Sequence, residues 1–521
     1  MDKWTSTRES YINWLSDSEL CEEFSKKIVF ENLSLWWLTT LMDKDNINET
    51  LWYEKLNRKL NFKKENNHKT KMDYFLLLLK LLKRLLFKTF SIFLIKLFFN
   101  DFKSDIKKSK KRDCFFALYT NCIHYDGNFI DRQYGFTSLQ NSKNKSYLIE
   151  LPENFYLIKN LFKIKKNLKK IPLEFIISNK NLKFVDIFKI YYFSLISFFK
   201  LTNLLKKKNY FFINNEDCRD ILKNKLLISF FGSIQDQLLR GKALERSLDS
   251  ISIINFINCF DFHPQARSFY YFAKKSEANN VININHANYS ENNIFFNYNK
   301  RDFSKNYSSF YSPKPDIFFA QGERYYNVLK NTFEGEKIFC LGSLKPELNK
   351  FQIEKKNFIE SKNSKKTITI LCSINDYKSF VKILNECDFD DTEIYVAAHP
   401  LKKVETIDYF KKKLKNDFTD VTNLDKTKIF EISEHIIFGD TSLGLELYIK
   451  NYNVIRLYCS EYIPTFDIDD EIPTATNKDE LLNLLHNKQV SQNNAQIEKN
   501  YFYKYDMKAS NRLEKILSEL N

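Results

Sequence analysis

The chain has 521 residues, of which 43% are hydrophobic and 28% are charged, so it can bury a large core and disorder of the whole chain is excluded. This length predicts several domains. Nine glycines exclude glycine-patterned repeats, and 81 Lys and Arg against 65 Asp and Glu give a net charge of +16. Such an excess favours phosphate-bearing partners: nucleic acid, nucleotide-activated substrates or an anionic membrane surface.

Nine cysteines are scattered along the chain without a CxxC pair. An odd, dispersed set is typical of buried, reduced thiols in a cytosolic protein rather than of a disulfide framework. The first ten residues, MDKWTSTRES, lack the basic and apolar regions of a signal peptide. We therefore expect the protein in the cytoplasm.

Residues 1–111 are predicted to form a helical extension. All five tryptophans lie in its first part, and Trp36 and Trp37 stand side by side. We interpret this pair as part of a core or an interdomain contact, because large aromatic side chains are usually buried. Stacking against an acceptor is the alternative.

Residues 73–99 are the most hydrophobic segment of the extension. Basic residues interrupt it and no apolar run reaches 18 residues, so it is not a plain transmembrane helix. On a helical wheel four basic side chains fall within an arc of about 140°, and the rest of the circumference is mainly Leu, Phe and Ile. The four are Lys80, Lys83, Arg84 and Lys88. This pattern predicts a peripheral helix on the anionic inner face of the cytoplasmic membrane, with a core helix as the alternative.

From about residue 112, short apolar strands alternate with helices. Strands are expected near 115–120, 146–151, 173–178, 251–261, 280–288, 315–322, 338–343, 367–373, 392–400, 435–442 and 453–458. Such alternation predicts parallel sheets with helices on both faces. We expect an α/β protein of two Rossmann-like domains that face each other across a cleft. Their bounds are 112–344 and 345–498, with a divide at 344–364, and a charged C-terminal helix follows at 499–521.

Polar side chains follow three expected strands of the second domain. His399 and Pro400 come at a strand end with Lys402 behind them, and Thr441 and Ser442 lie between a strand and a helix. Ligands bind at the carboxyl ends of parallel strands, and a helix N-terminus attracts anions. The pattern predicts a nucleotide phosphate site, although a structural His and a simple N-cap are the alternatives. Further predicted members of this site are Ser373 and Asn375 at its rim and Glu446 on a ribose hydroxyl.

In the first domain, Asp261 and His286 follow two neighbouring expected strands. A carboxylate and an imidazole at neighbouring strand ends are suited to general-base catalysis, so either residue is a candidate base, with Glu291 as the next. Structural roles are the alternative for both. Arg267 is a candidate for binding an acidic acceptor, with a salt bridge as the alternative.

Other motif classes are absent from the sequence. It contains no GxxxxGK[ST], GxGxxG, GxSxG or HExxH motif and no Cys/His zinc spacing. We therefore expect neither a metal nor a cofactor. RNA-binding signatures are also absent, so no nucleic-acid partner is expected.

The sequence resembles a known group of proteins. The segments NLSLWWLTTLMDKDN, FDFHPQARSFYYFAKKSEANNVININHANYS and PDIFFAQGERYYNVLKN resemble bacterial surface carbohydrate (O-antigen or lipopolysaccharide side-chain) biosynthesis proteins. The C-terminal half, with AAHPLKK and FGDTSLGLELYIKNYNVIRLY, is similar to GT-B glycosyltransferases that use CMP-activated sugars, the bacterial sialyl- and Kdo-transferases.

In those families an HP motif and a later Ser/Thr pair hold the nucleotide phosphate. The resemblance implies that His399 and Pro400 form the first element, Thr441 and Ser442 the second, and that Glu446 matches the acidic residue after the pair. The acidic catalytic motif of some sialyltransferases is not evident. The resemblance implies a GT-B-like, metal-independent glycosyltransferase that moves a sugar from a CMP-type donor to a glycan or lipid-linked glycan acceptor.

Three rival functions remain open at this point. A CDP-glycerol-type polyol-phosphate transferase would share the fold and would differ in the donor it hydrolyses. A non-catalytic, membrane-associated scaffold of glycan assembly would bind no nucleotide. A basic RNA-binding protein would show RNA affinity that falls steeply with salt.

Overall fold

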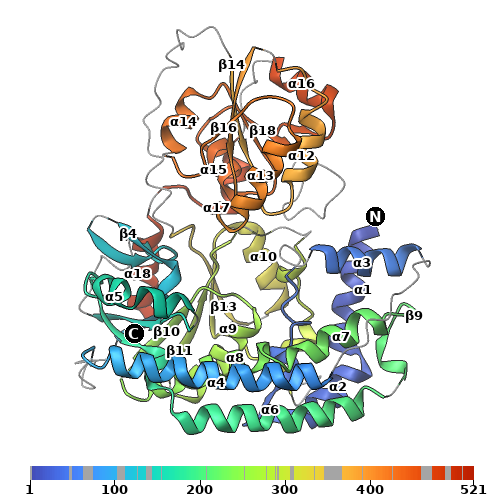
Figure 1. The fold of residues 1–521 in the computed structure, drawn as a ribbon. Coiled ribbons are helices and arrows are strands. Elements are labelled where there is room, and N and C mark those ends of the chain that lie inside the picture. The colour runs from blue at the N-terminus through green and yellow to red at the C-terminus, as the bar shows by residue number, and fades with distance from the viewer. Residues whose placement is uncertain are drawn as a thin grey trace.

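The computed structural model describes residues 3–45, 50–62, 74–102, 112–125, 127–135, 144–153, 155–206, 208–251, 253–276, 278–287, 289, 293–304, 310–333, 335–344, 366–389, 391–424, 426–458, 472–486, 494–506 and 508–520. Two lobes stand one above the other, and the chain ends in the lower lobe (Figure 1). The predicted divide at 344–364 lies outside the described residues except for Leu344, as does Glu291.

The lower lobe is built on a seven-stranded sheet in which every pairing is parallel. Its strands, in spatial order, are β13 (Lys337–Cys340), β12 (Ile317–Ala320), β11 (Asn280–Ile284), β10 (Ile253–Asn258), β3 (Arg112–Leu118), β6 (Lys145–Glu150) and β7 (Glu174–Ile177). The direction of winding reverses between β3 and β10. Ligands of doubly wound sheets bind at the carboxyl edge beside such a reversal.

Helices cover both faces of this sheet, as the sequence predicts. Phe115 and Ala117 of β3 belong to one hydrophobic cluster, whereas Cys114 and Phe116 belong to another on the opposite face. The helices of this lobe are α5 (Phe155–Leu168), α6 (Phe184–Leu204), α7 (Arg219–Ser229), α8 (Ser233–Leu248), α9 (Pro264–Lys275) and α10 (Glu323–Thr332). Small antiparallel pairs lie outside the sheet: β4 (Cys122–Tyr125) with β5 (Asn128–Asp131), and β8 (Phe212–Ile213) with β9 (Glu216–Asp217).

The upper lobe has a six-stranded parallel sheet with the same kind of reversal. Its strands, in spatial order, are β16 (Thr419–Asp420), β15 (Thr392–Ala397), β14 (Lys366–Leu371), β17 (His435–Phe438), β18 (Val454–Leu457) and β19 (Thr474–Ala475). The order reverses between β14 and β17. Its helices are α12 (Tyr377–Leu384), α13 (Lys403–Lys413), α14 (Lys426–Ile432), α15 (Ser442–Ile449) and α16 (Lys478–His486). The predicted pair of Rossmann-like domains with an N-terminal helical segment is confirmed.

The N-terminal extension packs against the first domain. It contains α1 (Lys3–Asp17), α2 (Glu19–Lys27), the β1–β2 hairpin (Val29–Phe30, Leu33–Ser34), α3 (Thr50–Phe62) and α4 (Tyr74–Phe98). Trp36 is fully buried, and the Trp37 indole N–H donates to the Phe310 carbonyl at 2.8 Å. The interpretation of this pair as core is confirmed, and stacking on an acceptor is wrong.

The C-terminal segment joins the two domains. Ile497 and Tyr501 of α17 (Asn494–Phe502) lie in a hydrophobic cluster of the second domain, while α17 also packs on α10 of the first. Helix α18 (Ala509–Leu520) returns to the first sheet, where Glu514 pairs with Lys145. The last two helices therefore link the domains rather than form a separate appendage.

Lys88 of α4 does not face outward, which corrects its predicted membrane role. Its ammonium pairs with Glu153 and lies 3.4 Å from Asp236, and its side chain is only 12% exposed. Burial works against the charge, but these two carboxylates outweigh it and hold the pKa of Lys88 above its ordinary value. Lys80, Lys83 and Arg84 are exposed. Among the described residues, no helix is long and apolar enough to cross a bilayer.

The eight cysteines within the described residues are free thiols, as expected, and most of them are buried. Cys459 lies outside the described residues. Burial raises the pKa of the Cys114 thiol to about 12, so this thiol is unreactive.

Candidate active site

Asp261 and His286 meet at the carboxyl edge of the first sheet. Asp261 follows β10 and His286 follows β11, and the carboxylate oxygen Oδ2 lies 3.5 Å from the imidazole Nδ1. Asp261 is fully buried, whereas the His286 side chain is 29% exposed. Of these two candidate bases, only His286 can therefore reach a substrate in solvent.

Two asparagines hold the Asp261 carboxylate. Asn283 Nδ2 donates to it at 3.0 Å, and Asn285 Nδ2 lies 3.3 Å from both of its oxygens. The Asp261 backbone N–H also donates to Asn283 Oδ1 at 3.1 Å, and its φ is +46°. A left-handed backbone is tolerated by Asp more readily than by most residues, and it is one form in which strain accumulates at functional sites. The network fixes the carboxylate in place beside His286.

A second His–Asp pair, which is not among the residues predicted from the sequence, lies close by. His263 Nδ1 is 2.6 Å from Asp43 Oδ1, and the His263 ring stacks on Phe295 with 4.0 Å between ring centroids. The charge of Asp261 also acts on His263. The available signal was the second His-Pro dipeptide, His263-Pro264, which follows a strand just as His399-Pro400 does.

Arg267 is not available to an acceptor, which corrects its predicted role. It is fully buried, its Nε donates to the Phe262 carbonyl at 3.0 Å, and its Nη1 donates to Ser312 Oγ at 3.1 Å. Its guanidinium also lies 5.5 Å from the Trp37 ring centroid. Arg267 therefore joins α9 to the N-terminal extension.

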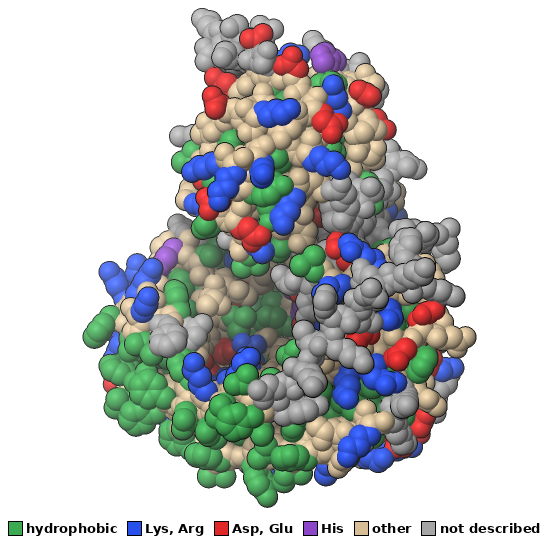
Figure 2. All heavy atoms as spheres, turned by 45° about the vertical axis from the view of Figure 1, so that its right-hand side comes forward, with side chains coloured by type: hydrophobic (Ala, Val, Ile, Leu, Met, Phe, Trp, Pro, Cys, Tyr) green, Lys and Arg blue, Asp and Glu red, His purple; other side chains and the backbone are tan. Residues whose placement is uncertain are grey.

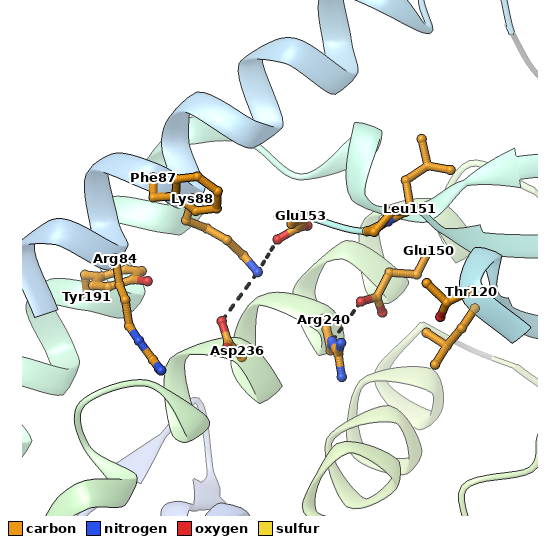
Figure 3. A pocket seen from close by; sticks show the side chains of 12 residues that line it. Arg84, Phe87, Lys88, Thr120, Glu150, Leu151, Glu153, Tyr191, Asp236 and Arg240 are labelled. Atoms are coloured by element: carbon orange, nitrogen blue, oxygen red, sulfur yellow. Dashed lines mark hydrogen bonds and ion pairs between the residues drawn. The ribbon is translucent and has the colours of Figure 1, made fainter. Parts of the chain in front are cut away.

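A pocket of about 420 Å³ opens at the same sheet edge, beside β3 and β6 (Figure 3). Three carboxylates and three cations line it together with apolar side chains. Two of the cations are paired: Lys88 with Glu153 and Asp236, and Arg240 with Glu150 at 2.8 Å. Burial raises the pKa of the Glu150 carboxyl above its ordinary value. The third cation, Arg84, extends beside Tyr191 and has no carboxylate partner among the described residues.

The pocket and the Asp261–His286 pair share one edge. β10, β3 and β6 are consecutive in the sheet, and neighbouring strands lie about 4.8 Å apart. By this spacing the β6 side of the pocket lies roughly 10 Å from Asp261. Figure 2 shows a hollow in the surface between the two domains.

In the second domain, the predicted donor residues gather around the reversal of the sheet. Ser373 and Asn375 follow β14, Thr441 and Ser442 follow β17, and His399 follows β15 on the other side of β14. The loops after β15, β14 and β17 are therefore consecutive along the carboxyl edge. This edge is where doubly wound sheets bind ligands.

Asp376 ties two of these loops together. One of its oxygens accepts from the Ser373 N–H at 2.8 Å and the other from the Asp440 N–H at 3.2 Å. Burial raises the pKa of Asp376 to about 7. Gly439 is required beside it, because a Cβ there would lie 2.1 Å from Asp376 Oδ2. The Asp440 carboxylate in turn pairs with Arg456, with 3.2 Å between Oδ1 and Nη2. This pair fixes the position of the residue directly before Thr441 and Ser442.

His399 and Lys402 make local contacts. His399 Nδ1 accepts from the Leu401 N–H at 3.3 Å, so the ring caps the turn that Pro400 begins. The Lys402 ammonium pairs with Glu405 at 2.6 Å and is 41% exposed. Lys402 is thus at the rim of the site.

Thr441 is the N-cap of α15, and its hydroxyl accepts from the Leu443 N–H at 3.4 Å. Its hydroxyl hydrogen remains available for a ligand oxygen. Glu446, one turn further, is 8% exposed, and its charge acts on Lys450 and Tyr505. Burial lowers the pKa of Lys450 to about 8, and Glu446 only partly offsets this.

No protein-family model and no curated protein matches the chain. Similar solved structures include S. aureus MnaA with UDP (11% identity, TM-score 0.40), which covers 79% of this chain and 98% of that one. A Neisseria meningitidis UDP-GlcNAc 2-epimerase bound to UDP-GlcNAc has 11% identity and a TM-score of 0.40, over 78% and 100%. The wall teichoic acid polymerase TagF has 13% identity and a TM-score of 0.41, over 86% and 97%. At such scores, function has to be argued from the chain's own residues.

Proposed function

We propose that this protein is a glycosyltransferase of bacterial surface glycan synthesis that moves a sugar from a nucleotide-activated, CMP-type donor to a glycan acceptor. One observation carries the proposal. Both sheets reverse their winding order, and polar, chemically suited side chains line the carboxyl edge of each sheet beside the reversal. A transferase needs one site for the donor and one for the acceptor, and each sheet edge would supply one of them.

The donor would bind in the second domain. The Ser442 hydroxyl, the Thr441 hydroxyl and the first N–H groups of α15 offer hydrogen bonds and a positive helix end to a phosphate. His399 and Ser373 border the same edge from the neighbouring loops. Protein groups alone would hold the phosphate, so no metal is needed for binding.

The acceptor would bind in the first domain, where His286 takes the proton from the attacking hydroxyl. Asp261 acts as a positioning residue, since it is buried and lies 3.5 Å from His286 Nδ1. The carboxylate there orients the ring and stabilises the imidazolium that forms. The pocket beside β3 and β6, with Arg84 and Arg240, replaces Arg267 as the candidate acceptor contact.

The proposal is tested by calorimetric titration with CMP, CDP, UDP and AMP. Wild-type protein is expected to bind CMP, and His399→Ala and Ser442→Ala each weaken this affinity about ten- to a hundredfold, which corresponds to losing roughly 1.5–3 kcal/mol of charge-assisted hydrogen bonding. His486→Ala and Thr476→Ala serve as matched controls in the same domain. His486 is the last residue of α16, and Thr476 lies just before this helix.

The outcomes separate the rival functions. Binding of CDP in preference to CMP supports a polyol-phosphate transferase. No binding of any nucleotide supports a scaffold. Unchanged CMP affinity in both variants overturns the donor site.

A further inference from the structure

Helices α4 and α6 expose large apolar side chains along their whole lengths. Leu86 of α4 is 63% exposed and Phe188 of α6 is 56% exposed. We call these side chains the α4–α6 face. Its members are Phe75, Leu76, Leu79, Leu82, Leu86, Phe90, Phe93, Leu97 and Phe98 of α4, and Phe184, Val185, Phe188, Tyr192, Ile196 and Phe199 of α6. An apolar surface of this size marks an interaction site rather than ordinary surface.

The exposure of this face does not come from a missing core on which α4 would pack. The inner side of α4 is already packed, with Leu81, Ile92 and Ile95 buried in the main hydrophobic cluster. The same inner side carries Lys88, which is paired with Glu153. The outer side therefore carries many large apolar side chains although the inner side already packs on the core, unlike an ordinary helix on the surface of a water-soluble domain.

The two helices form one continuous surface. They pack side by side, and the Lys96 ammonium of α4 lies 5.7 Å from the centroid of the Phe184 ring of α6. Figure 2 shows hydrophobic side chains gathered over the lower left of the molecule, the region of α4 and α6. No described segment of this chain covers them.

The charge around the face is almost entirely positive. Helices α4, α5 and α6 together contain eleven Lys and Arg residues and one acidic residue, Asp186, which is buried against Arg246. Helix α5 adjoins the end of α4, where Lys165 pairs with Asp101 at 2.6 Å. Within the described chain several exposed lysines of these helices make no ion pair. They are Lys80, Lys83, Lys159, Lys163, Lys166 and Lys200.

We propose that the α4–α6 face docks on an anionic lipid leaflet. Both helices lie flat in the boundary between headgroups and acyl chains, their apolar side chains enter the acyl region, and the unpaired lysines contact lipid phosphates. This orientation differs from the basic arc that the sequence predicts, because Lys88 faces inward. A second copy of the chain fits the face less well, since it would bring two lysine-rich surfaces together.

The inference goes beyond the proposed function and does not depend on it. If both hold, Arg84 connects them, because it lines the acceptor pocket and belongs to the helix that lies on the membrane. The polar end of a lipid-linked acceptor would then reach the pocket without leaving the leaflet.

The test is flotation of the full chain with phosphatidylglycerol vesicles and with phosphatidylcholine vesicles. Wild type is expected to float with phosphatidylglycerol vesicles. High salt should reduce the floating fraction without abolishing it, because salt screens the charge of the lysines but does not weaken the burial of the apolar side chains. Lys80→Gln/Lys83→Gln/Lys200→Gln weakens binding about fivefold per lysine at low salt. Leu82→Gln/Leu86→Gln/Phe90→Gln weakens it roughly tenfold or more at every salt concentration.

Matched controls remove the same groups from the second domain. Leu401→Gln/Val404→Gln/Leu424→Gln replaces three exposed apolar side chains, and Lys411→Gln/Lys412→Gln/Lys413→Gln replaces three exposed lysines. Both controls should float like wild type. Wild type that floats with neither lipid, or an apolar variant that floats as well as wild type, overturns the proposal. A dimer in light scattering that the apolar variant loses, with no flotation, assigns the face to a second copy instead.

Discussion

His263, which follows β10, lies 2.6 Å from Asp43 of the N-terminal extension. The contact joins a segment that precedes both domains to the carboxyl edge of the first sheet. Burial works against a charged imidazole here, but the hydrogen bond that the ring donates to Asp43 and the negative charges of Asp43, Asp45 and Asp261 together outweigh burial, so the pKa of His263 is raised. The pair is therefore a pH-dependent link between the extension and the site.

Asp43→Asn should lower the free energy of unfolding more at pH 5.5 than at pH 9. A raised pKa in the folded state means that protonation of His263 favours folding. This contribution is complete below the unfolded pKa of about 6.5 and is lost as the pH rises through the raised value. Since the His263 and Asp43 side chains are 34% and 32% exposed, we expect a loss of no more than about 1 kcal/mol at pH 5.5, measured by urea unfolding.

In a His263→Gln background, Asp43→Asn should show no such pH dependence, because the titrating partner is gone. An equal loss at both pH values in the wild-type background would mean that Asp43 stabilises the fold by packing alone.

His286→Gln should lower turnover about 10²- to 10⁴-fold and leave CMP affinity unchanged, because it removes the base and not the donor site. Asp261→Asn should lower turnover less and change the pH profile of kcat, since it acts through His286. His124→Gln, an exposed histidine of the same domain, is the matched control. Wild-type turnover in both variants would place the proton acceptor elsewhere, and His263 and Glu291 would be the next residues to substitute.

The sequence predicts the fold because each buried strand is a short apolar run and each run alternates with a helix. It also predicts which strand ends carry polar residues, so Asp261 and His286 could be paired from the order of the strands alone. It could not predict that Asp261 is buried. That depends on Asn283 and Asn285, which look like ordinary polar residues of a strand.

The orientation of α4 is a second feature that could not be predicted from the sequence. Periodicity groups Lys80, Lys83, Arg84 and Lys88 on one side of the helix, but it does not say which side faces the protein. Two carboxylates from distant parts of the chain, Glu153 and Asp236, draw Lys88 inward. The side that the sequence assigns to headgroups is therefore partly the side that packs on the domain.

Lys88→Gln and Arg84→Gln should differ sharply in stability although the residues are one helical turn apart. Loss of Lys88 leaves two carboxylates in the pocket without their cation, which should cost about 3 kcal/mol in the free energy of unfolding. Arg84 is exposed and has no carboxylate partner in the described chain, so its loss should cost less than about 0.5 kcal/mol. Chemical unfolding of the two variants tests this, and equal stabilities would contradict the inward placement of Lys88.

Gly322→Ala should disturb the seam between the two domains. Gly322 precedes α10, and a Cβ at this position would lie 2.2 Å from the Asn500 carbonyl oxygen and 2.6 Å from the Tyr501 carbonyl carbon of α17. These are backbone atoms, so the helix itself has to move. Its neighbours resist that movement, because Arg324 Nη1 donates to the Tyr501 hydroxyl at 2.9 Å and Lys499 pairs with Glu323 at 3.1 Å.

We expect Gly322→Ala to lower the free energy of unfolding by about 1–3 kcal/mol, the usual cost of overpacking. CMP affinity should stay near wild type, since the donor loops lie elsewhere, whereas turnover should fall because α17 sets how the two domains face each other. Gly335→Ala is the control: a Cβ there meets nothing within 4 Å, and only its φ of +83° adds strain. It should therefore lose a similar or smaller amount of stability but keep its turnover. Unchanged turnover in Gly322→Ala, with stability reduced, would show that the alignment of the domains does not depend on the contact between α10 and α17.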